Sequence, residues 1–349
     1  MQFEFVGAAQ TVTGSKHILR VNGKTYLLDC GMFQGHRKES DDANRFLPIK
    51  TSEIDAVILS HAHIDHAGLL PLLVKKGYSG PIYCTHATRD LCSIMLQDSA
   101  RIQEHDAEHM SKKTGKNIPP LYTVEEAMEC MMQFRSVGYE QPVPLDQGVK
   151  MTFHDAGHIL GSALEEWEIE DKDTGEHTRF CFTGDLGRKH LPILREPTQI
   201  KDVDILITES TYGNRFHDEL GDVEERLTKV INETVNRGGK IFIPAFAVER
   251  TQEILYVLRL LMNQGKIIKL PIYIDSPLAS DATDIFKIHP ECFDDDTKAL
   301  EAGGVFPFLE GEGVRFMRSV EESKSLDKIN YHHRRVWYGR IRSYRASRS

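Results

Sequence analysis

Short apolar runs alternate with glycine-containing turns from the start of the chain to about residue 208. Most of these runs end at a cluster of polar side chains, which is typical of strands in a layered α/β domain. The predicted strands are residues 24–28, 55–59, 82–85, 150–154, 179–183 and 204–208. Helical spacing of apolar residues predicts helices over 67–76 and 87–110. We expect these elements to form one domain over residues 1–208.

The pattern changes after Glu209. Helices are predicted over 222–236, 248–262 and 280–288, and strands over 240–243 and 271–274. Strands that alternate with helices in this way form parallel sheets. Residues 209–330 are therefore expected to form a second, partial domain, in which the strand 271–274 is an unpaired edge. Because such an edge invites pairing with another chain, a homodimer is one expected assembly.

The last segment, residues 331–349, has a different composition. From His332 onward it holds six arginines and no acidic residue, whereas the preceding forty residues are rich in aspartate and glutamate. One interpretation is a solvated basic tail. The other is a segment that is not native coding sequence, as a shifted reading frame would produce.

Bulk composition sets broad limits on the class of protein. No apolar run is long enough to span a membrane, and no signal pattern opens the sequence. The six cysteines form no Cys-x-x-Cys pair, which favours reduced, buried thiols in a cytoplasmic protein. A net charge of −9 argues against a broad basic surface for nucleic acid, although it does not describe a single groove.

The strongest chemical signal directly follows the predicted strand 55–59. Residues 61–66 read His-Ala-His-Ile-Asp-His, which places three imidazoles and a carboxylate within six residues. These are ligand types that suit zinc. In an extended loop His61 and His63 point to the same side and can share one ion, whereas Asp65 and His66 can face a second. A surface histidine cluster without metal is the alternative, which four ligand-type residues at this spacing disfavour.

Two further segments each place one ligand-type residue after a strand. His158 follows the strand 150–154 and Asp185 follows the strand 179–183, and nearby glycines let the backbone come close to an ion. Because functional residues gather at the carboxyl ends of strands in α/β layers, we expect both to join the histidine motif. His154 competes with His158, but it lies within its strand, where a core or supporting role is the alternative.

Asp29 also follows a predicted strand, residues 24–28. One interpretation is that its carboxylate accepts an N–H from a ligand histidine and so fixes the tautomer of that ring. The other is an ordinary turn aspartate, which the local sequence favours equally.

At these residues the sequence resembles the metallo-β-lactamase superfamily, whose motif is His-x-His-x-Asp-His with later histidine and aspartate ligands. It is more narrowly similar to the β-CASP branch, the RNA-processing nucleases that include RNase J-type enzymes and the cleavage-and-polyadenylation endonuclease. Four segments carry the narrower similarity: residues 7–15, 209–213, 243–253 and 275–279. The segment Pro-Ala-Phe-Ala-Val-Glu-Arg-Thr-Gln-Glu at 244–253 points most clearly to the nuclease branch.

The resemblance implies a metallo-β-lactamase αββα sandwich followed by a partial, parallel β-CASP domain. The implied ligands of two zinc ions are His61, His63, His158, Asp185, Asp65 and His66. The first three bind one ion, the last two bind the other, and Asp185 bridges them. Asp29 is implied to orient a ligand histidine.

The resemblance also implies RNA as the partner of the second domain. Glu209 matches the acidic motif that opens the β-CASP insertion. Phe246, Arg250 and Ser276 are implied to line the RNA channel. From the sequence alone, Arg250 is equally well interpreted as a surface arginine or an ion-paired one.

The sequence departs from the family pattern after residue 330. Members continue with a further strand and a Ser-Gly-Met turn, then with a proton-transfer histidine and a last histidine ligand of the second metal. None of these motifs is found in this sequence, and His332 and His333 lie in the basic tail without that context. The sequence therefore resembles a C-terminally truncated member with an incomplete second metal site and reduced activity.

The chemistry implied is hydrolysis of RNA phosphodiester bonds. Two metals about 3.5–4 Å apart can activate a water and neutralise charge on the scissile phosphate. Asp65 and Asp185 are the expected catalytic carboxylates. One alternative is a thioester or lactone hydrolase of the same fold, which the helix–strand segment after residue 209 disfavours. The other is a non-catalytic RNA-binding relative, which the intact ligand set disfavours.

Overall fold

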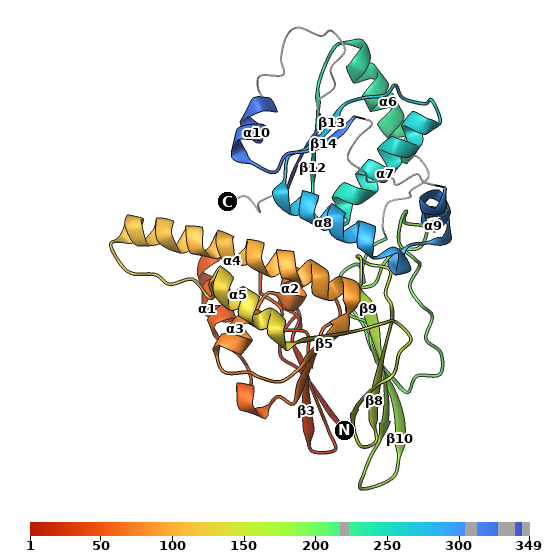
Figure 1. Cartoon of the computed structure of the whole chain (residues 1–349). Helices are drawn as coiled ribbons and strands as arrows, with labels where there is room; N and C mark the ends of the chain where they lie inside the picture. The colour runs from red at the N-terminus through yellow and green to blue at the C-terminus, as the bar shows by residue number, and fades with distance from the viewer. Residues whose placement is uncertain (217–222, 304–312, 327–338, 344–349) are drawn as a thin grey trace. The chain divides into compact units, whose positions relative to one another are not determined.

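The computed structural model describes residues 1–216, 223–303, 313–326 and 339–343. The chain divides into two compact units (Figure 1). Unit 1 consists of Met1–Lys189 and Glu196–Thr211, and unit 2 of His190–Arg195 and Tyr212–Ser349. The division lies close to the change of pattern after Glu209, but the short segment 190–195 joins the second unit.

The first sheet of unit 1 has six strands in the order β1-β2-β3-β4-β5-β6. They are β1 (Gln2–Phe5), β2 (His17–Val21), β3 (Lys24–Leu28), β4 (Ala56–Ile58), β5 (Ile82–Thr85) and β6 (Phe134–Val137). β1, β2 and β3 pair antiparallel, and β3 to β6 pair parallel. The strands expected at 24–28, 55–59 and 82–85 are confirmed, whereas β1, β2 and β6 were not predicted from the sequence.

The second sheet of unit 1 has five strands in the order β11-β10-β9-β8-β7. They are β7 (Val143–Asp146), β8 (Val149–Asp155), β9 (Ala163–Glu170), β10 (His177–Phe182) and β11 (Ile205–Ile207). All neighbours are antiparallel except β10 and β11, which are parallel. The predicted strands 150–154, 179–183 and 204–208 correspond to β8, β10 and β11.

The core of unit 1 lies between its two sheets. Alternate residues of the strands point inward, because side chains alternate across a strand with a period of two. Leu28 and Ile58 of the first sheet belong to the same buried cluster as Phe153, Trp167 and Phe180 of the second. The two sheets therefore share one apolar core, as a sandwich requires.

Helices lie beside the first sheet of unit 1 (Figure 1). They are α1 (Arg37–Arg45), α2 (Ile64–Ala67), α3 (Leu70–Lys75), α4 (His86–Thr114) and α5 (Val124–Cys130). The helix expected over 67–76 corresponds to α3, which begins at Leu70 with Pro71 in its first turn, and α2 precedes it as a separate short helix. None of the described helices has the length and apolar character needed to cross a membrane.

Unit 2 contains a parallel sheet in the order β12-β15-β13-β14. The strands are β12 (Ile241–Ala245), β13 (Ile272–Ile274), β14 (Val314–Phe316) and β15 (Gly339–Ser343). Its helices are α6 (Val223–Asn236), α7 (Arg250–Asn263), α8 (Pro277–Ile288), α9 (Asp295–Ala302) and α10 (Val320–Ser325). The predicted alternation of strands and helices is confirmed, and a separate core includes Leu255 and Leu258 of α7 and Ile274 of β13.

One expectation about unit 2 is wrong. The strand 271–274 was expected to be an unpaired edge, but β13 pairs with β14 on one side and with β15 on the other. Residues 339–343, within the segment expected to be a basic tail, supply β15. The homodimer that rested on a free edge at β13 loses that support, and His332 and His333 lie outside the described residues.

Candidate metal centre

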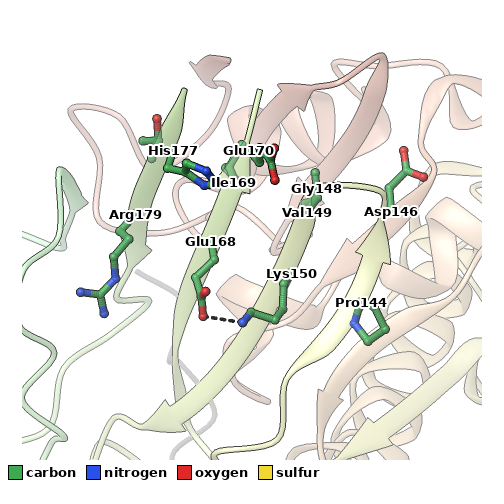
Figure 2. A pocket seen from close by; sticks show the side chains of 11 residues that line it. Pro144, Asp146, Gly148, Val149, Lys150, Glu168, Ile169, Glu170, His177 and Arg179 are labelled. Atoms are coloured by element: carbon green, nitrogen blue, oxygen red, sulfur yellow. Dashed lines mark ion pairs between the residues drawn. The ribbon is translucent and has the colours of Figure 1, made fainter. Parts of the chain in front are cut away.

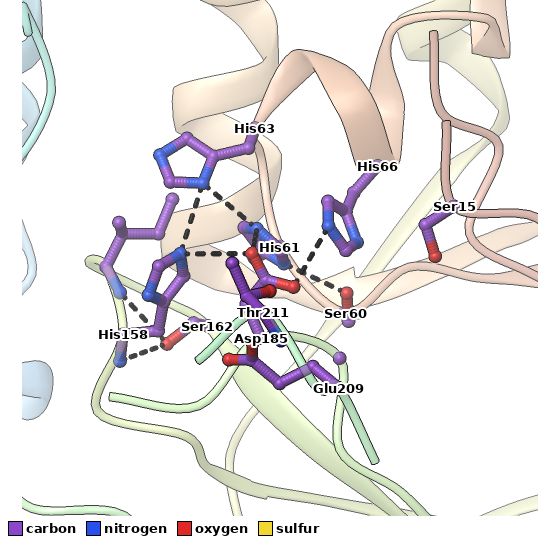
Figure 3. A network of polar contacts seen from close by, with 12 residues as sticks. Ser15, Ser60, His61, His63, His66, His158, Ser162, Asp185, Glu209 and Thr211 are labelled. Carbon is purple, nitrogen blue, oxygen red and sulfur yellow. Dashed lines mark hydrogen bonds and ion pairs between the residues drawn. The ribbon is translucent and has the colours of Figure 1, made fainter. Parts of the chain in front are cut away.

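The candidate ligands of unit 1 lie on loops that follow the carboxyl ends of strands from both sheets. β4 leads into Ser60 and His61, and β3 leads into Asp29. From the second sheet, β8 leads into the loop of His158 and β10 into the loop of Asp185. The sandwich therefore brings together residues that are more than a hundred positions apart in the sequence (Figure 3).

Four of these side chains converge closely enough to share one ion. His63 Nδ1 lies 3.1 Å from His61 Nε2 and 3.2 Å from His158 Nε2. Asp185 Oδ2 lies 3.8 Å from His61 Nε2 and 3.5 Å from His158 Nε2. The ligand atoms of all four residues lie within 4.8 Å of one another. The donor set of three imidazoles and one carboxylate fits a zinc-type cation.

Asp65 and His66, the ligands expected for a second ion, do not both lie beside Asp185 in the same way. His66 Nε2 lies 3.2 Å from Asp185 Oδ1, so Asp185 directs one oxygen toward each group of histidines. Asp65 lies in α2, where its main-chain oxygen accepts a hydrogen bond from Ser15 N at 2.8 Å. Among the described residues, the converging group of four includes neither Asp65 nor His66.

Asp29 lies at the centre of the polar contacts beneath these histidines. Its Oδ2 accepts a hydrogen bond from His66 Nδ1 at 2.7 Å, which leaves Nε2 of that ring facing Asp185. The residue is fully buried and has a positive φ of 59°, a conformation that aspartate adopts more readily than most residues. Asp29 is thus both a turn residue and the partner of a candidate ligand histidine.

The electrostatics of the cluster leave most of its ligand atoms free of protons. Burial lowers the pKa of His61 and of His63, and it lowers the pKa of His158 to about 3. Burial alone would raise the pKa of Asp185, but the neighbouring His66 outweighs this effect and brings it down to about 2. Neutral imidazoles and ionised carboxylates are the forms that bind metal.

His66 differs from the other three imidazoles. Burial alone would lower its pKa, but Asp29 and Asp185 together raise the pKa well above the usual histidine value. The two carboxylates therefore make the position between them favourable for positive charge.

Two glycines allow the ligand loops to approach one another. A Cβ at Gly187 would lie 1.7 Å from the main-chain oxygen of Gly157, next to His158. A Cβ at Gly31 would lie 1.6 Å from the main-chain oxygen of Asp65. Any larger residue at either position would therefore push apart the loops that carry the candidate ligands.

His154, the competing ligand candidate, lies elsewhere. Its Nδ1 is 2.9 Å from Glu140 Oε1 and its Nε2 is 2.7 Å from Glu166 Oε2. Both ring nitrogens are thus engaged by carboxylates, which matches the supporting role rather than the ligand role.

Glu209 supports the loop of Asp185. Its Oε1 accepts a hydrogen bond from Leu186 N at 2.8 Å. Its own N–H points to Thr183 Oγ1 at 3.4 Å, so the contact spans the segment that carries Asp185. This contact could not be predicted from the sequence, because it depends on β10 and β11 being neighbours.

The residues implied to contact RNA in unit 2 differ in accessibility. Phe246 is 69% exposed in the loop after β12. Arg250, the first residue of α7, forms an ion pair with Glu253 at 2.5 Å. Ser276 is only 2% exposed and caps α8 by accepting a hydrogen bond from Ala279 N. The RNA-contacting roles stay predictions, and burial makes Ser276 the least suited of the three.

A hollow of about 460 Å³ lies on the second sheet, over β7 to β10 (Figure 2). Its charged side chains include Lys150 and Glu168, which pair at 2.8 Å, and Arg179, which pairs with Glu166. None of the candidate metal ligands lines it. Its charges compensate one another, as on a solvated sheet surface.

Comparison with known proteins agrees with this arrangement. The sequence profile of the metallo-beta-lactamase superfamily domain matches residues 18–177, and that of the Beta-Casp domain matches residues 251–340. Ribonuclease TTHA0252 of Thermus thermophilus is 34% identical over 324 residues, which is 92% of this chain and 69% of that protein.

Two further relatives are longer proteins. The transcription termination factor FttA of Methanosarcina mazei is 37% identical, over 87% of this chain and 46% of the factor. The endoribonuclease ysh1 of Schizosaccharomyces pombe is 29% identical, over 94% of this chain and 41% of that protein. The chain thus spans about half the length of several curated relatives.

A solved structure shares the fold. The crystal structure of a protein of unknown function from Enterococcus faecalis V583 has a TM-score of 0.53 at 12% identity, covering 98% of this chain and 77% of that one. Together, the clustered ligands and the two matched domains show that this chain belongs to the β-CASP branch of the metallo-β-lactamase superfamily.

Proposed function

We propose that the protein is a metal-dependent hydrolase that cleaves phosphodiester bonds in RNA. The observation that carries the proposal is the convergence of His61, His63, His158 and Asp185 within 4.8 Å at the ends of strands from both sheets. The relatives named ribonuclease and endoribonuclease supply the substrate class. We further propose that the cation is zinc and that two ions bind, on either side of Asp185.

In this proposal the residues of unit 1 hold and orient the reacting groups. A bound divalent cation supplies Lewis acidity, which neutralises phosphate charge and makes a water molecule acidic. His61, His63 and His158 would hold the first ion through ring nitrogens, and His66, whose Nε2 faces Asp185, would help to hold the second. Asp65, which belongs to the same sequence motif, would accept the proton of the attacking water.

The phosphate backbone of RNA must be held in register while it is cut. We propose that Arg250 and Phe246 of unit 2 contact RNA, since a guanidinium suits phosphate and an exposed aromatic ring suits an unstacked base. All six cysteines are buried and lie outside any disulfide, which supports the proposal of a reducing, cytoplasmic location.

The test is cleavage of an end-labelled RNA by the purified chain. We expect cleavage that a chelator abolishes and added Zn²⁺ restores. Asp185→Asn, which keeps the shape of the side chain but removes its charge, should abolish cleavage, whereas Glu168→Gln on the surface of β9 should not. Cleavage that survives both the chelator and Asp185→Asn would overturn the proposal, and turnover of a thioester but not of RNA would redirect it to small-molecule hydrolysis.

A further inference from the structure

The hydroxyl group of Ser60 lies between Asp29 and His61, in a position that the proposed function has not used. We propose that Ser60 is a positioning residue that transmits the orientation of Asp29 to the ring of His61. The proposal rests on the proposed function in taking His61 as a metal ligand. Asp29 then orients two histidine rings that lie on either side of Asp185. It orients His66 directly and His61 through Ser60.

The contacts of Ser60 form a continuous path. Ser60 Oγ is 2.9 Å from Asp29 Oδ1 and 3.1 Å from Asp29 Oδ2. The same oxygen is 3.0 Å from His61 Nδ1. The main-chain N–H of Ser60 also donates to Asp29 Oδ1 at 2.9 Å, so the backbone that carries the hydroxyl is fixed to the same carboxylate.

The direction of these hydrogen bonds follows from what each group can donate. The Asp29 carboxylate accepts four contacts, from Ser15 Oγ, Ser60 N, Ser60 Oγ and His66 Nδ1. An ionised carboxylate has no proton to give, so the single hydroxyl proton of Ser60 points to Asp29. The oxygen of Ser60 is then an acceptor toward His61, whose Nδ1 must carry the ring proton.

This assignment determines which ring nitrogen of His61 is free. With the proton on Nδ1, the lone pair lies on Nε2, the atom that faces His63 Nδ1 at 3.1 Å and Asp185 Oδ2 at 3.8 Å. The direct contact of His66 Nδ1 with Asp29 orients the His66 ring in the same way, with Nε2 facing Asp185. Ser60 thus performs for His61 what Asp29 itself performs for His66.

The surroundings hold the hydroxyl in place. Ser60 is fully buried, and its main-chain oxygen accepts a hydrogen bond from Ala163 N at 2.9 Å. A Cβ at Gly184 would lie 2.7 Å from both Cβ and Oγ of Ser60. The loop that carries Asp185 therefore lies directly against the serine, which leaves its side chain little room to choose another rotamer.

Ser15 offers a matched control. It is also buried, and its hydroxyl donates to Asp29 Oδ2 at 3.0 Å, but no contact joins it to His61, His63 or His158 among the described hydrogen bonds. Ser15→Ala removes one donor from Asp29 and leaves the path to His61 intact. Ser60→Ala removes one donor from Asp29 together with that path.

The experiment measures the affinity of each folded variant for Zn²⁺ by competition with a chromophoric chelator. Loss of a group that orients a ligand typically weakens metal binding by about 10–100-fold. We expect at least a tenfold loss for Ser60→Ala and less than a threefold loss for Ser15→Ala. Equal losses in the two variants, or no loss in Ser60→Ala, would overturn the proposal.

A second measurement needs no variant at this position. In the metal-free wild-type protein, ¹⁵N NMR of labelled histidine rings reports which nitrogen carries the proton. The signals of His61 are assigned by their absence in His61→Gln. We expect Nδ1–H for His61, and Nε2–H would overturn the proposal. Neither measurement involves RNA, so a protein that cleaves no RNA but shows both results would refute the proposed function and leave the role of Ser60 standing.

Discussion

The side chains of His63 and His154 show how position decides the role of a histidine. His63 lies within 3.2 Å of two other imidazoles, whereas His154 lies between two glutamates. We expect His63→Ala to reduce the zinc bound per chain, because it removes one of the converging donors. His154→Ala is the control and should leave zinc content unchanged. Elemental analysis after dialysis measures both, and equal zinc in His63→Ala and wild type would contradict the ligand assignment.

Glu165 of β9 is a buried acid outside the metal centre. It is fully buried, and its Oε2 accepts a hydrogen bond from Trp167 Nε1 at 3.3 Å. Burial and the nearby charge of Asp29 raise its pKa well above the usual range. A raised pKa in the folded state means that its contribution to stability is fully present below the unfolded-state pKa and is lost as pH rises.

We therefore expect Glu165→Gln to gain stability relative to wild type as pH rises from 5 to 8, since glutamine cannot ionise. Thermal unfolding at several pH values measures the difference in melting temperature. Glu168→Gln on the same strand, where the side chain is half exposed and paired with Lys150, is the control and should show no such trend. A constant difference between Glu165→Gln and wild type would show that Glu165 is not protonated on folding.

Arg250 tests the role of unit 2 in RNA binding. Its guanidinium is exposed on one side and pairs with the buried Glu253 on the other. Hydrogen bonds to charged groups contribute about 1.5–3 kcal/mol, so Arg250→Ala is expected to weaken RNA binding roughly tenfold or more. Filter binding at fixed salt measures the effect, and zinc content should not change. Unaltered RNA affinity with a lower melting temperature would instead indicate a purely structural ion pair.

At this scale the sequence identifies residues whose chemistry is visible in their type and spacing. The motif at 61–66, His158 and Asp185 could be found because ligand-type residues follow predicted strands. Ser60 and the contact of Glu209 with Leu186 could not, because serine and glutamate are common and their roles depend on distances across the fold. The cap formed by Ser276 was hidden for the same reason.

At the scale of elements, the loops after β8 and β10 depend on one close approach. Gly187→Ala would place a methyl group 1.7 Å from the main-chain oxygen of Gly157, which no small adjustment can relieve. We expect this variant to separate Asp185 from His158 and to lose zinc, while circular dichroism stays close to wild type. Gly303→Ala, where the nearest atom is 3.4 Å away, is the control. Full zinc content in Gly187→Ala would show that the loops tolerate separation.

The composition or the short length of some strands explains why they were not predicted. β9 carries Glu165, Glu166, Glu168 and Glu170, so its composition conceals a strand whose inward-facing residues include Trp167 and Ile169. β14 has only three residues and gains its stability from pairing with β13 rather than from its own sequence. Long segments with clear periodicity, such as α4 and α7, were predicted to within a few residues.

At the scale of the whole molecule, the metal centre belongs to one unit, because every candidate ligand lies in unit 1. Binding to the folded state alone stabilises by about 2.7 kcal/mol at a free concentration a hundred times the dissociation constant. Calorimetry of the whole chain should therefore show that Zn²⁺ raises the unfolding temperature of the part that contains His61. Hydrogen exchange assigns each transition to its unit. A shift confined to α6 to α9 would contradict the location of the site.

The order of strands in unit 2 has a consequence for how the chain is made. β12 and β13 follow one another in the sequence, yet β15 lies between them and pairs with both. While the ribosome has not yet released residues 339–343, β12 and β13 have no shared neighbour and their facing edges stay open. Parallel pairing across such long sequence separations is slow and exposes strand edges in the meantime. The nascent chain therefore passes through an interval in which strand edges of unit 2 are exposed to non-native pairing, whereas unit 1 has all its strands by residue 207.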